Sequence, residues 1–479
     1  MVHLLVVALF CSRALGDLAG DIRAVLQDRY MQRVDAAVVV WALGRDAGND
    51  KSLFEHQPTK PLIPASNLKL VTTGAALSVL KPDFRFRTVL VARASVGGAF
   101  EVAIVGDGDP TFGDLKLLEG TGWNATTVFR TWADLLKKVG ITRISRLLVD
   151  DSIFDRQFFQ PSWPADQENL HYCAQVAGLN LNANTVWFDV RPGKPGEAPS
   201  WTIKPETGYI TVRNLATTSS KNAVWLARDR GSNQVSLRGE CSEPALGLRV
   251  TIHDPALFAG TVALETFRAA GIEVSEGPQL AEDVHAQLKA DAGNWQVIAI
   301  HQTPLAQVIN RTNKDSINLY AESLCKRMGF ASTGRSGSWS SGTAAMASYL
   351  RSLGIADDQY RLDDGCGLSR KNAISAGAIV RVLADGFHGS ASKTFVGSLA
   401  VGGMDGTLDN RFGGSLRGRV FAKSGYINQV SALSGYLRAT DGNWYAFSIL
   451  MNDVPSGTNG TAKEMQERIV QAIDANTRR

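Results

Sequence analysis

Ser66 and Lys69 have the residue types and the spacing for nucleophilic catalysis. They lie in the stretch Pro64-Ala65-Ser66-Asn67-Leu68-Lys69, and an apolar run that ends at Leu80 follows. A proline before a serine and an apolar run predicts the first turn of a buried helix. Residues three apart share one face of a helix. A buried lysine with a lowered pKa is able to take the proton of a serine hydroxyl, so the spacing supplies a nucleophile and a base.

The Ser-x-x-Lys spacing is weak on its own. Roughly one or two matches arise by chance in a chain of this length, and a second match joins Ser390 to Lys393. An ordinary helix start, with the serine as N-cap and the lysine in solvent, explains such a match equally well. Ser66 opens a long apolar segment, whereas Ser390 lies in a polar stretch. Partner residues elsewhere in the chain must decide between the two interpretations.

Two later segments carry suitable partners. Ser316-Ile317-Asn318 offers a hydroxyl and an amide within a helix predicted over residues 305–328, and Lys423-Ser424-Gly425 offers a cation and a hydroxyl on a predicted strand. With Ser66-x-x-Lys69, these segments resemble the three ordered motifs of penicillin-binding proteins and serine β-lactamases, as close variants of Ser-Asp-Asn and Lys-Thr-Gly. The long gap after the first motif resembles one branch, the class C low-molecular-weight penicillin-binding proteins, a family of Ser-Lys D-alanyl-D-alanine carboxypeptidases and endopeptidases. Stretches typical of this branch occur at residues 106–111, 149–154, 364–370 and 403–408.

The resemblance implies a catalytic role for each residue of the first two motifs. Ser66 attacks the carbonyl of the penultimate D-alanine and becomes an acyl-enzyme, with Lys69 as the proton acceptor. Ser316 relays that proton to the leaving D-alanine nitrogen. Asn318 holds Lys69 and the substrate backbone by hydrogen bonds.

The resemblance also implies a strand that binds the substrate. Lys423 attracts the terminal carboxylate and lowers the pKa of Lys69, while the hydroxyl of Ser424 binds the carboxylate. The backbone N–H groups of Ser66 and Tyr426 form an oxyanion hole. Ser424 stands where the family usually has threonine, and Tyr426 stands where smaller residues are common. We expect the chemistry to survive both changes and the shape of the cleft to differ.

A pocket for the side chain of the stem peptide is implied at Trp163, Asp166, Leu368 and Arg370, from a Trp-x-x-Asp segment and a Gly-Leu-Ser-Arg loop. An acid and a base at one pocket suit an amphoteric side chain such as diaminopimelate. A local salt bridge or helix cap explains these residues equally well. In the same loop Cys366 replaces a common serine, and a buried thiol, a disulfide half and a cleft residue all remain open.

These features predict a serine-type D-Ala-D-Ala carboxypeptidase or DD-endopeptidase that acts on the stem peptides of peptidoglycan and is inhibited covalently by β-lactams. A β-lactamase or esterase on the same fold is the first alternative, although no base for deacylation is identifiable in the sequence. A non-catalytic peptidoglycan-binding protein is the second, although every motif hydroxyl and lysine is intact.

Both helices and strands are predicted among the elements that must position these residues, so we expect an α+β fold. We also expect more than one domain, because 479 residues exceed what one core usually organises. Longer helices and strands occur towards both ends, whereas short alternating strands and glycine turns dominate the middle. We predict a penicillin-binding catalytic domain, an antiparallel sheet flanked by helices, from residues 17–82 and 293–479. A β-rich region at 83–292, in two nested small domains, is inserted between the first and second motifs.

Composition excludes several classes of partner. The formal net charge is +4 and the basic residues are spread along the chain, so we expect neither nucleic acid nor an anionic membrane as a partner. No later stretch is apolar for long enough to form a transmembrane segment. The histidines and cysteines lack metal-ligand spacing, so we expect no metal and no cofactor.

Residues 1–16 resemble a short secretory signal peptide, with an apolar run followed by Ala14-Leu15-Gly16. A buried N-terminal strand is the alternative interpretation. A signal peptide implies an exported protein, periplasmic or extracytoplasmic, in which four of the five cysteines remain and disulfides are permitted but not required.

Overall fold

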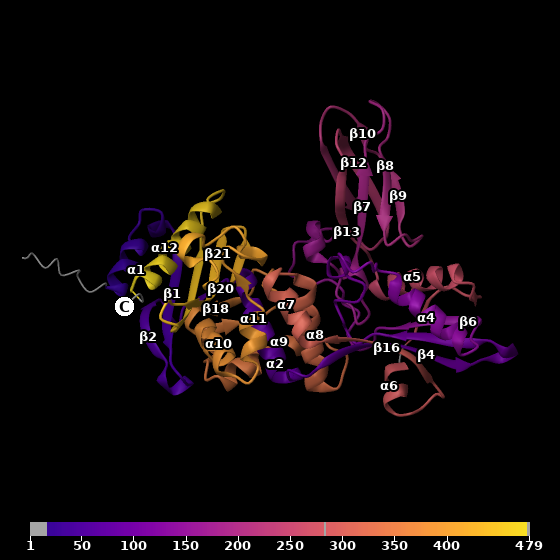
Figure 1. Ribbon diagram of the computed structural model, residues 1–479, viewed down its shortest axis with the longest axis horizontal. Coiled ribbons are helices and arrows are strands. Elements are labelled where there is room, and N and C mark those ends of the chain that lie inside the picture. The colour runs from indigo at the N-terminus through magenta and orange to yellow at the C-terminus, as the bar shows by residue number, and fades with distance from the viewer. Residues whose placement is uncertain (1–16, 282–283, 477–479) are drawn as a thin grey trace, which may run out of the picture.

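The computed structural model describes residues 17–281 and 284–476, so the predicted signal peptide at 1–16 lies outside the described residues. Both ends of the chain meet in one part of the molecule, and the middle of the chain forms a second part beside it (Figure 1). This α+β arrangement agrees with the predicted fold class.

The first part is built on a six-stranded antiparallel sheet, in the order β19-β20-β21-β22-β1-β2. Strand β1 lies between β22 and β2, which places an N-terminal strand in a sheet made largely by the C-terminal segment. Successive residues of a strand point to opposite faces, and in β1 Val38 and Val40 enter one core while Ala37 and Val39 enter another. The strands span β1 Asp35–Leu43, β2 Lys51–His56, β19 Ala400–Val401, β20 Val420–Ile427, β21 Val430–Arg438 and β22 Trp444–Asn452.

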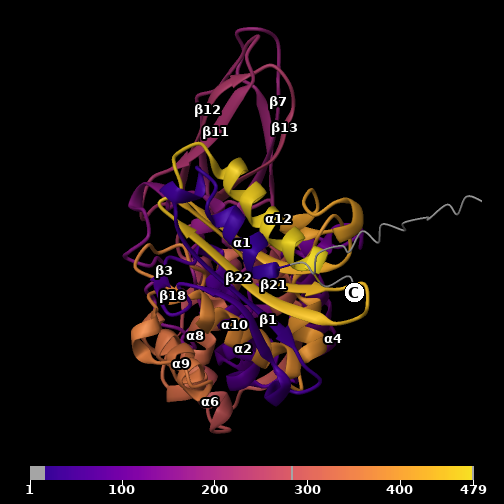
Figure 2. The ribbon, with the colours of Figure 1, turned by 90° about the vertical axis from the view of Figure 1, so that its left-hand side faces the viewer.

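Helices cover both faces of this sheet. Helices α1 (Leu18–Leu26) and α12 (Asn459–Asn476) contact each other and cover one face (Figure 2). The buried stripe of α12 includes Met465 and Ile469, which confirms the prediction that this stripe packs on the preceding strands. The other face carries helices α2 Leu68–Leu80, α7 Leu305–Lys314, α8 Asn318–Thr333, α9 Trp339–Ser352, α10 Ala376–His388 and α11 Ser392–Gly397.

A small sheet sets the position of the nucleophile relative to a loop. Strand β3 (Pro61–Leu62) directly precedes the Ser66 turn and pairs with β18 (Ala373–Ser375), which also pairs with β17 (Tyr360–Arg361). The loop at residues 362–372 joins β17 to β18. The pairing therefore holds both ends of this loop close to the segment that leads into Ser66.

The inserted region contains a second sheet, in the order β14-β6-β5-β4-β16, with β15 also paired to β6. Helices α4 (Thr127–Lys138) and α5 (Pro255–Ala269) share a core with it. The strands span β4 Arg85–Ala94, β5 Phe100–Val105, β6 Arg143–Asp150, β14 Glu273–Val274, β15 Gln279–Leu280 and β16 Gln296–Pro304, and short helices occur at α3 Leu115–Leu118 and α6 Val284–Lys289.

Two small sheets form the part that projects from the rest of the molecule (Figures 1 and 2). One has the order β13-β7-β8, and in the other β12 pairs with β9, β10 and β11. Their bounds are β7 Thr185–Arg191, β8 Ser200–Lys204, β9 Thr211–Asn214, β10 Thr217–Thr218, β11 Ala223–Arg228, β12 Gln234–Cys241 and β13 Ala245–Thr251. The division of the chain into domains stays a prediction, and the pairing of β16 with β4 favours a second boundary after Pro304 rather than at residue 292.

The predicted single helix over residues 305–328 is wrong. Helix α7 ends at Lys314 and α8 begins at Asn318. Between them Ser316 has a φ of +61°, in the left-handed region. A residue with this backbone cannot continue a right-handed helix, so the chain turns and the second motif lies between two helices.

No helix within the described ranges is long and apolar enough to cross a membrane.

Candidate active site

Ser66 lies in a single 3₁₀ turn, Ala65–Asn67, directly before α2. Two glycines allow other segments to approach this turn closely. A Cβ on Gly367 would lie 1.9 Å from the carbonyl oxygen of Ala65, and one on Gly425 would lie 3.0 Å from the backbone nitrogen of Ser66. The loop at 362–372 and strand β20 therefore both reach the backbone of Ser66, a contact that larger side chains would prevent.

Lys69 is fully buried and makes three polar contacts. Its Nζ lies 3.1 Å from Oγ of Ser66, 2.7 Å from Oδ1 of Asn318 and 2.8 Å from the carbonyl oxygen of Cys366. Oδ1 of Asn318 and the carbonyl oxygen of Cys366 have no hydrogen to donate, so both accept from Lys69. A neutral amine has two hydrogens and one lone pair, so donation to these two acceptors leaves the lone pair for the hydroxyl of Ser66.

Burial lowers the pKa of Lys69, which is the direction that a base requires. Cys366, Asp364 and Glu322 act against burial and raise the pKa. The sequence led us to expect that Lys423 would hold this pKa low. Burial is the main cause instead, because the side chain is enclosed by α2, α8 and the 362–372 loop.

Lys423 is also fully buried and lies on β20. Its Nζ donates to Oγ of Ser316 at 2.9 Å and to the carbonyl oxygen of Ser424 at 2.9 Å. Burial lowers its pKa well below the usual range, the charge of Lys69 lowers it further, and Asp315 opposes both. The charge of Lys69 thus disfavours a charge on Lys423.

The second motif connects to the inserted region. Asn318 is the first residue of α8, and its Nδ2 donates to the carbonyl oxygen of Tyr172 at 2.8 Å. One amide hydrogen is therefore held by the insertion, while Oδ1 accepts from Lys69. The hydrogen bond to Tyr172 orients the amide so that its oxygen, and not its nitrogen, faces Lys69.

A cavity of about 540 Å³ opens in front of Ser66. Ser424 is outside the described lining, and its hydroxyl forms a hydrogen bond with that of Thr407, at 2.8 Å. Tyr426 forms part of the wall and is 57% exposed. None of the described residues that line the cavity carries a carboxylate; they are Ser66, Pro164, Gln167, Tyr172, Ser316, Asn318, Gly367, Leu368, Arg370, Tyr426, Ile427 and Asn428.

The structure brings only half of the predicted side-chain pocket to the cavity. Leu368 and Arg370 line it, and Arg370 also donates to the carbonyl oxygen of Asn428 at 2.7 Å. Trp163 is 3% exposed, and its indole N–H donates to Asp364 at 2.9 Å. Asp166 is exposed and outside the described lining. Trp163 therefore supports the loop from behind, with its ring in the core. The structure does not bring the predicted acid, Asp166, to the cavity beside Arg370, and the pairing of the two stays a prediction.

Cys366 is a buried, unpaired thiol, and the four cysteines that the structure describes are all free. Of the three interpretations left open for it, the buried thiol is confirmed. Its contribution to the site is its backbone carbonyl, which accepts from Lys69.

Two buried carboxylates behind Lys69 escaped prediction. Glu322 accepts from the backbone N–H of Cys366 at 2.7 Å, from that of Gly365 at 2.9 Å and from the indole of Trp339 at 2.7 Å. Burial raises the pKa of Glu322 to about 7. Its position four residues after Asn318, on the same helix face, was a signal that the sequence offered.

Asp364 is the second buried carboxylate. It accepts from the N–H groups of Gly367 and Ser369 and from the side chains of Trp163 and Asn372. Glu322, Asp364 and Cys366 are close enough to hold a metal ion. Their carboxylate oxygens are already occupied by N–H donors, however, which is typical of anions that order a loop rather than of metal ligands.

Comparisons with known proteins agree with this geometry. A model of the D-Ala-D-Ala carboxypeptidase 3 (S13) family matches residues 18–476. The D-alanyl-D-alanine carboxypeptidase of Actinomadura sp. (strain R39) is 31% identical over 461 residues, which cover 91% of this chain and 81% of that protein.

Solved structures show the same fold. Penicillin binding protein 4 from Haemophilus influenzae superimposes with a TM-score of 0.77, at 20% identity, over 95% of this chain and 99% of that one. Its complex with a β-lactam superimposes with a TM-score of 0.72 over the same shares, at 21% identity. The family match covers nearly all of the described residues, and the chain belongs to the D-Ala-D-Ala carboxypeptidase 3 (S13) family.

Proposed function

We propose that this chain is a serine-type D-Ala-D-Ala carboxypeptidase that acts on peptidoglycan stem peptides through an acyl-enzyme on Ser66. One observation carries the proposal. Nζ of Lys69 lies 3.1 Å from Oγ of Ser66, and two fixed acceptors direct its remaining lone pair at the hydroxyl. This arrangement is that of a nucleophile with its general base.

In the acylation step, Oγ of Ser66 attacks the carbonyl carbon of the penultimate D-alanine while Lys69 takes the hydroxyl proton. The carbonyl oxygen becomes an oxyanion that accepts from the N–H groups of Ser66 and Tyr426, each donor accounting for about a hundredfold in rate. The C–N bond then breaks, and the leaving amine receives the proton from Lys69 by way of Ser316. Lys423, 2.9 Å from the hydroxyl of Ser316, orients that relay.

The terminal carboxylate of the substrate binds beside Ser424 and Lys423. A hydroxyl and a cation on neighbouring residues of β20 suit a carboxylate, and the Thr407 hydroxyl orients that of Ser424. β-Lactams carry a carboxylate and a reactive amide in a similar arrangement, and we propose that they acylate Ser66. The complex of the related penicillin binding protein 4 with a β-lactam supports this.

The described cavity lining supports a hydrolase with a persistent β-lactam adduct over a β-lactamase. Rapid loss of the adduct requires a general base for water, and no carboxylate lines the cavity within the described residues. The intact set of Ser66, Lys69, Ser316 and Lys423 likewise disfavours a binding protein without activity. The apolar run at residues 1–16 supports export to the cell wall, where this substrate is found.

A labelled penicillin tests the proposal. We expect intact-mass measurement to show one stable adduct per chain, and we expect release of D-alanine from a synthetic pentapeptide. The Ser66→Ala variant should lose both activities, by more than roughly 10⁴-fold. Ser390→Ala is the matched control, because Ser390 begins the other Ser-x-x-Lys match, and it should behave as the wild type. Rapid loss of the adduct would favour a β-lactamase, and an unmodified wild-type chain would contradict the proposal.

A further inference from the structure

The turn that carries Ser316 needs support from outside its own helices. Ser316 has a left-handed backbone, which is strained for a non-glycine residue. Such a turn keeps its shape when its surroundings hold both flanking helices in place. The helices here are α7, which ends at Lys314, and α8, which begins at Asn318.

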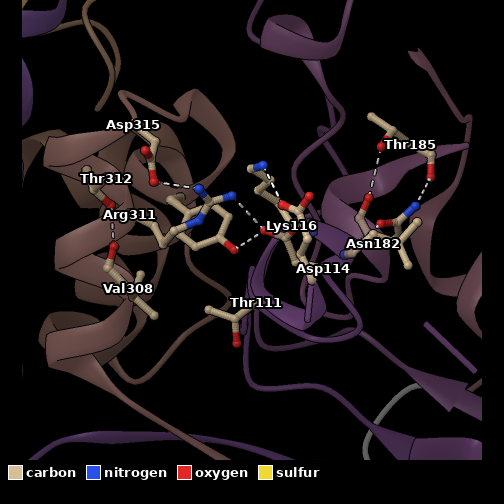
Figure 3. A network of polar contacts seen from close by, with 12 residues as sticks. Thr111, Asp114, Lys116, Asn182, Thr185, Val308, Arg311, Thr312 and Asp315 are labelled. Atoms are coloured by element: carbon tan, nitrogen blue, oxygen red, sulfur yellow. Dashed lines mark hydrogen bonds and ion pairs between the residues drawn. The ribbon is translucent and has the colours of Figure 1, made fainter. Parts of the chain in front are cut away.

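Asp114, a residue of the inserted region, contacts both helices at once (Figure 3). Its Oδ2 accepts from Nη2 of Arg311 on α7, at 3.2 Å, and from the hydroxyl of Tyr320 on α8. Its Oδ1 accepts from the backbone N–H of Lys116, at 2.9 Å, which fixes the carboxylate in its own loop. The Asp114 side chain is 4% exposed, so water competes little for these contacts.

Arg311 extends the network to the residue before Ser316. Its Nη1 pairs with the carboxylate of Asp315, and its guanidinium lies over the ring of Tyr320, 5.7 Å from the centroid. Asp315 in turn raises the pKa of Lys423, the partner of Ser316. The network thus reaches the turn from its N-terminal side through Arg311 and from its C-terminal side through Tyr320.

We infer that Asp114 is a positioning residue for the acylation reaction, and that it holds Ser316 and Asn318 at their places beside Lys423 and Lys69 by bridging α7 and α8. This inference rests on the proposed function. It assigns the inserted region a part in the chemistry that is separate from any contact with the stem peptide.

A second ion pair between the insertion and α8 provides a matched control. Asp107 pairs with Arg327 at 2.9 Å, and both side chains are mostly buried. This pair also joins the inserted region to α8, but Arg327 lies in the third turn of the helix and has no contact of this kind with α7. If Asp114 merely attached the two parts of the molecule, loss of either pair would have the same consequence.

The test compares Asp114→Asn with Asp107→Asn in the full-length chain. Dependence of the rate of adduct formation on penicillin concentration separates the acylation rate constant from the affinity of the first complex. We expect Asp114→Asn to lower the acylation rate constant about tenfold or more, with affinity changed less than about threefold. Asp107→Asn should keep the wild-type rate constant. The fraction of chains that finally form the adduct is measured as well. A misfolded variant lowers this fraction, whereas slow chemistry lowers only the rate constant.

Tyr320→Phe provides a second variant that removes one hydrogen bond and preserves shape. We expect it to lower the acylation rate constant about threefold, and to have little further effect when it is added to Asp114→Asn, because both act through one contact. Equal rate constants for the Asp114→Asn and Asp107→Asn variants, or additive effects of Asp114→Asn and Tyr320→Phe, would overturn the inference. A wild-type chain that forms no adduct would instead contradict the proposed function.

Discussion

The two lysines of the site have opposite surroundings. Lys69 donates to a side-chain amide and a backbone carbonyl, and the carboxylates of Glu322 and Asp364 raise its pKa against the effect of burial. Lys423 donates to a hydroxyl and a carbonyl, and the carboxylate of Asp315 raises its pKa against the effects of burial and of Lys69. The same residue type is therefore held in two different electrostatic environments, one on α2 and the other on β20.

The difference shows how binding and base strength are connected. In the cleft without substrate, burial and the charge of Lys69 both lower the pKa of Lys423. A substrate carboxylate beside Ser424 favours the ammonium form of Lys423. That ammonium then disfavours a second charge on Lys69. We therefore expect a bound substrate carboxylate to favour Lys69 as a base.

The largest expected effect comes from placing arginine at each lysine position in turn. Arginine keeps its proton, so Lys69→Arg should lower the acylation rate constant by between about 10² and 10⁴. Lys423→Arg keeps a cation where a cation is needed, and it should retain the rate within about tenfold. Adduct formation with labelled penicillin measures both. Equal losses at the two positions would show that the lysines do not differ in role.

A smaller effect is expected for Lys423→Ala. The variant loses the donor to Ser316 and the cation for the carboxylate, so acylation should slow by about 10². Without a neighbouring cation the pKa of Lys69 rises, and the acid limb of the pH–rate profile should move to higher pH. Lys423→Arg should leave that limb in place. Acylation of Lys423→Ala at the wild-type rate would refute the role given to Lys423.

The smallest effect concerns Glu322, one of the two buried carboxylates behind Lys69. The pKa of Glu322 is raised from 4.5 to about 7, so between these values the folded chain keeps a proton that the unfolded chain releases. Stability must then fall as pH rises through this window, by at most about 3 kcal/mol. Glu322→Gln does not titrate, so the free energy of unfolding of the wild type relative to this variant should decline from pH 4.5 to 7.

An exposed glutamate supplies the control for this prediction. The pKa of Glu119 is lowered by its hydrogen bond with Lys116, so Glu119→Gln should give a pH-dependent difference of the opposite sign. Denaturant unfolding at a series of pH values measures both differences. Parallel curves for the wild type and Glu322→Gln would show that this carboxylate is not a raised acid.

The chemistry of the site was accessible from the sequence because acyl transfer needs particular residue types at short local spacings. Ser66 and Lys69 share one turn, and Lys423 and Ser424 are neighbours on a strand. The inserted β-rich region could be predicted for a similar reason, since the alternation of apolar and polar residues and the glycine turns are local patterns. Trp163 was misjudged because a motif does not reveal whether an aromatic ring faces a cavity or a core. Glu322 was missed because its backbone partners, Gly365 and Cys366, lie on a loop more than forty residues away.

The sequence by itself determined which residues could carry the chemistry, since a hydroxyl, an amine and the groups that assist them are properties of residue types. Tertiary structure decided how those atoms are disposed. It broke the expected helix at Ser316, identified burial as the main cause of the lowered pKa of Lys69, and brought Asp114 from the insertion onto both helices beside that turn. Backbone angles, desolvation and contacts between distant segments depend on what surrounds a residue in space, and none of these is a property of the residue or its neighbours in the chain.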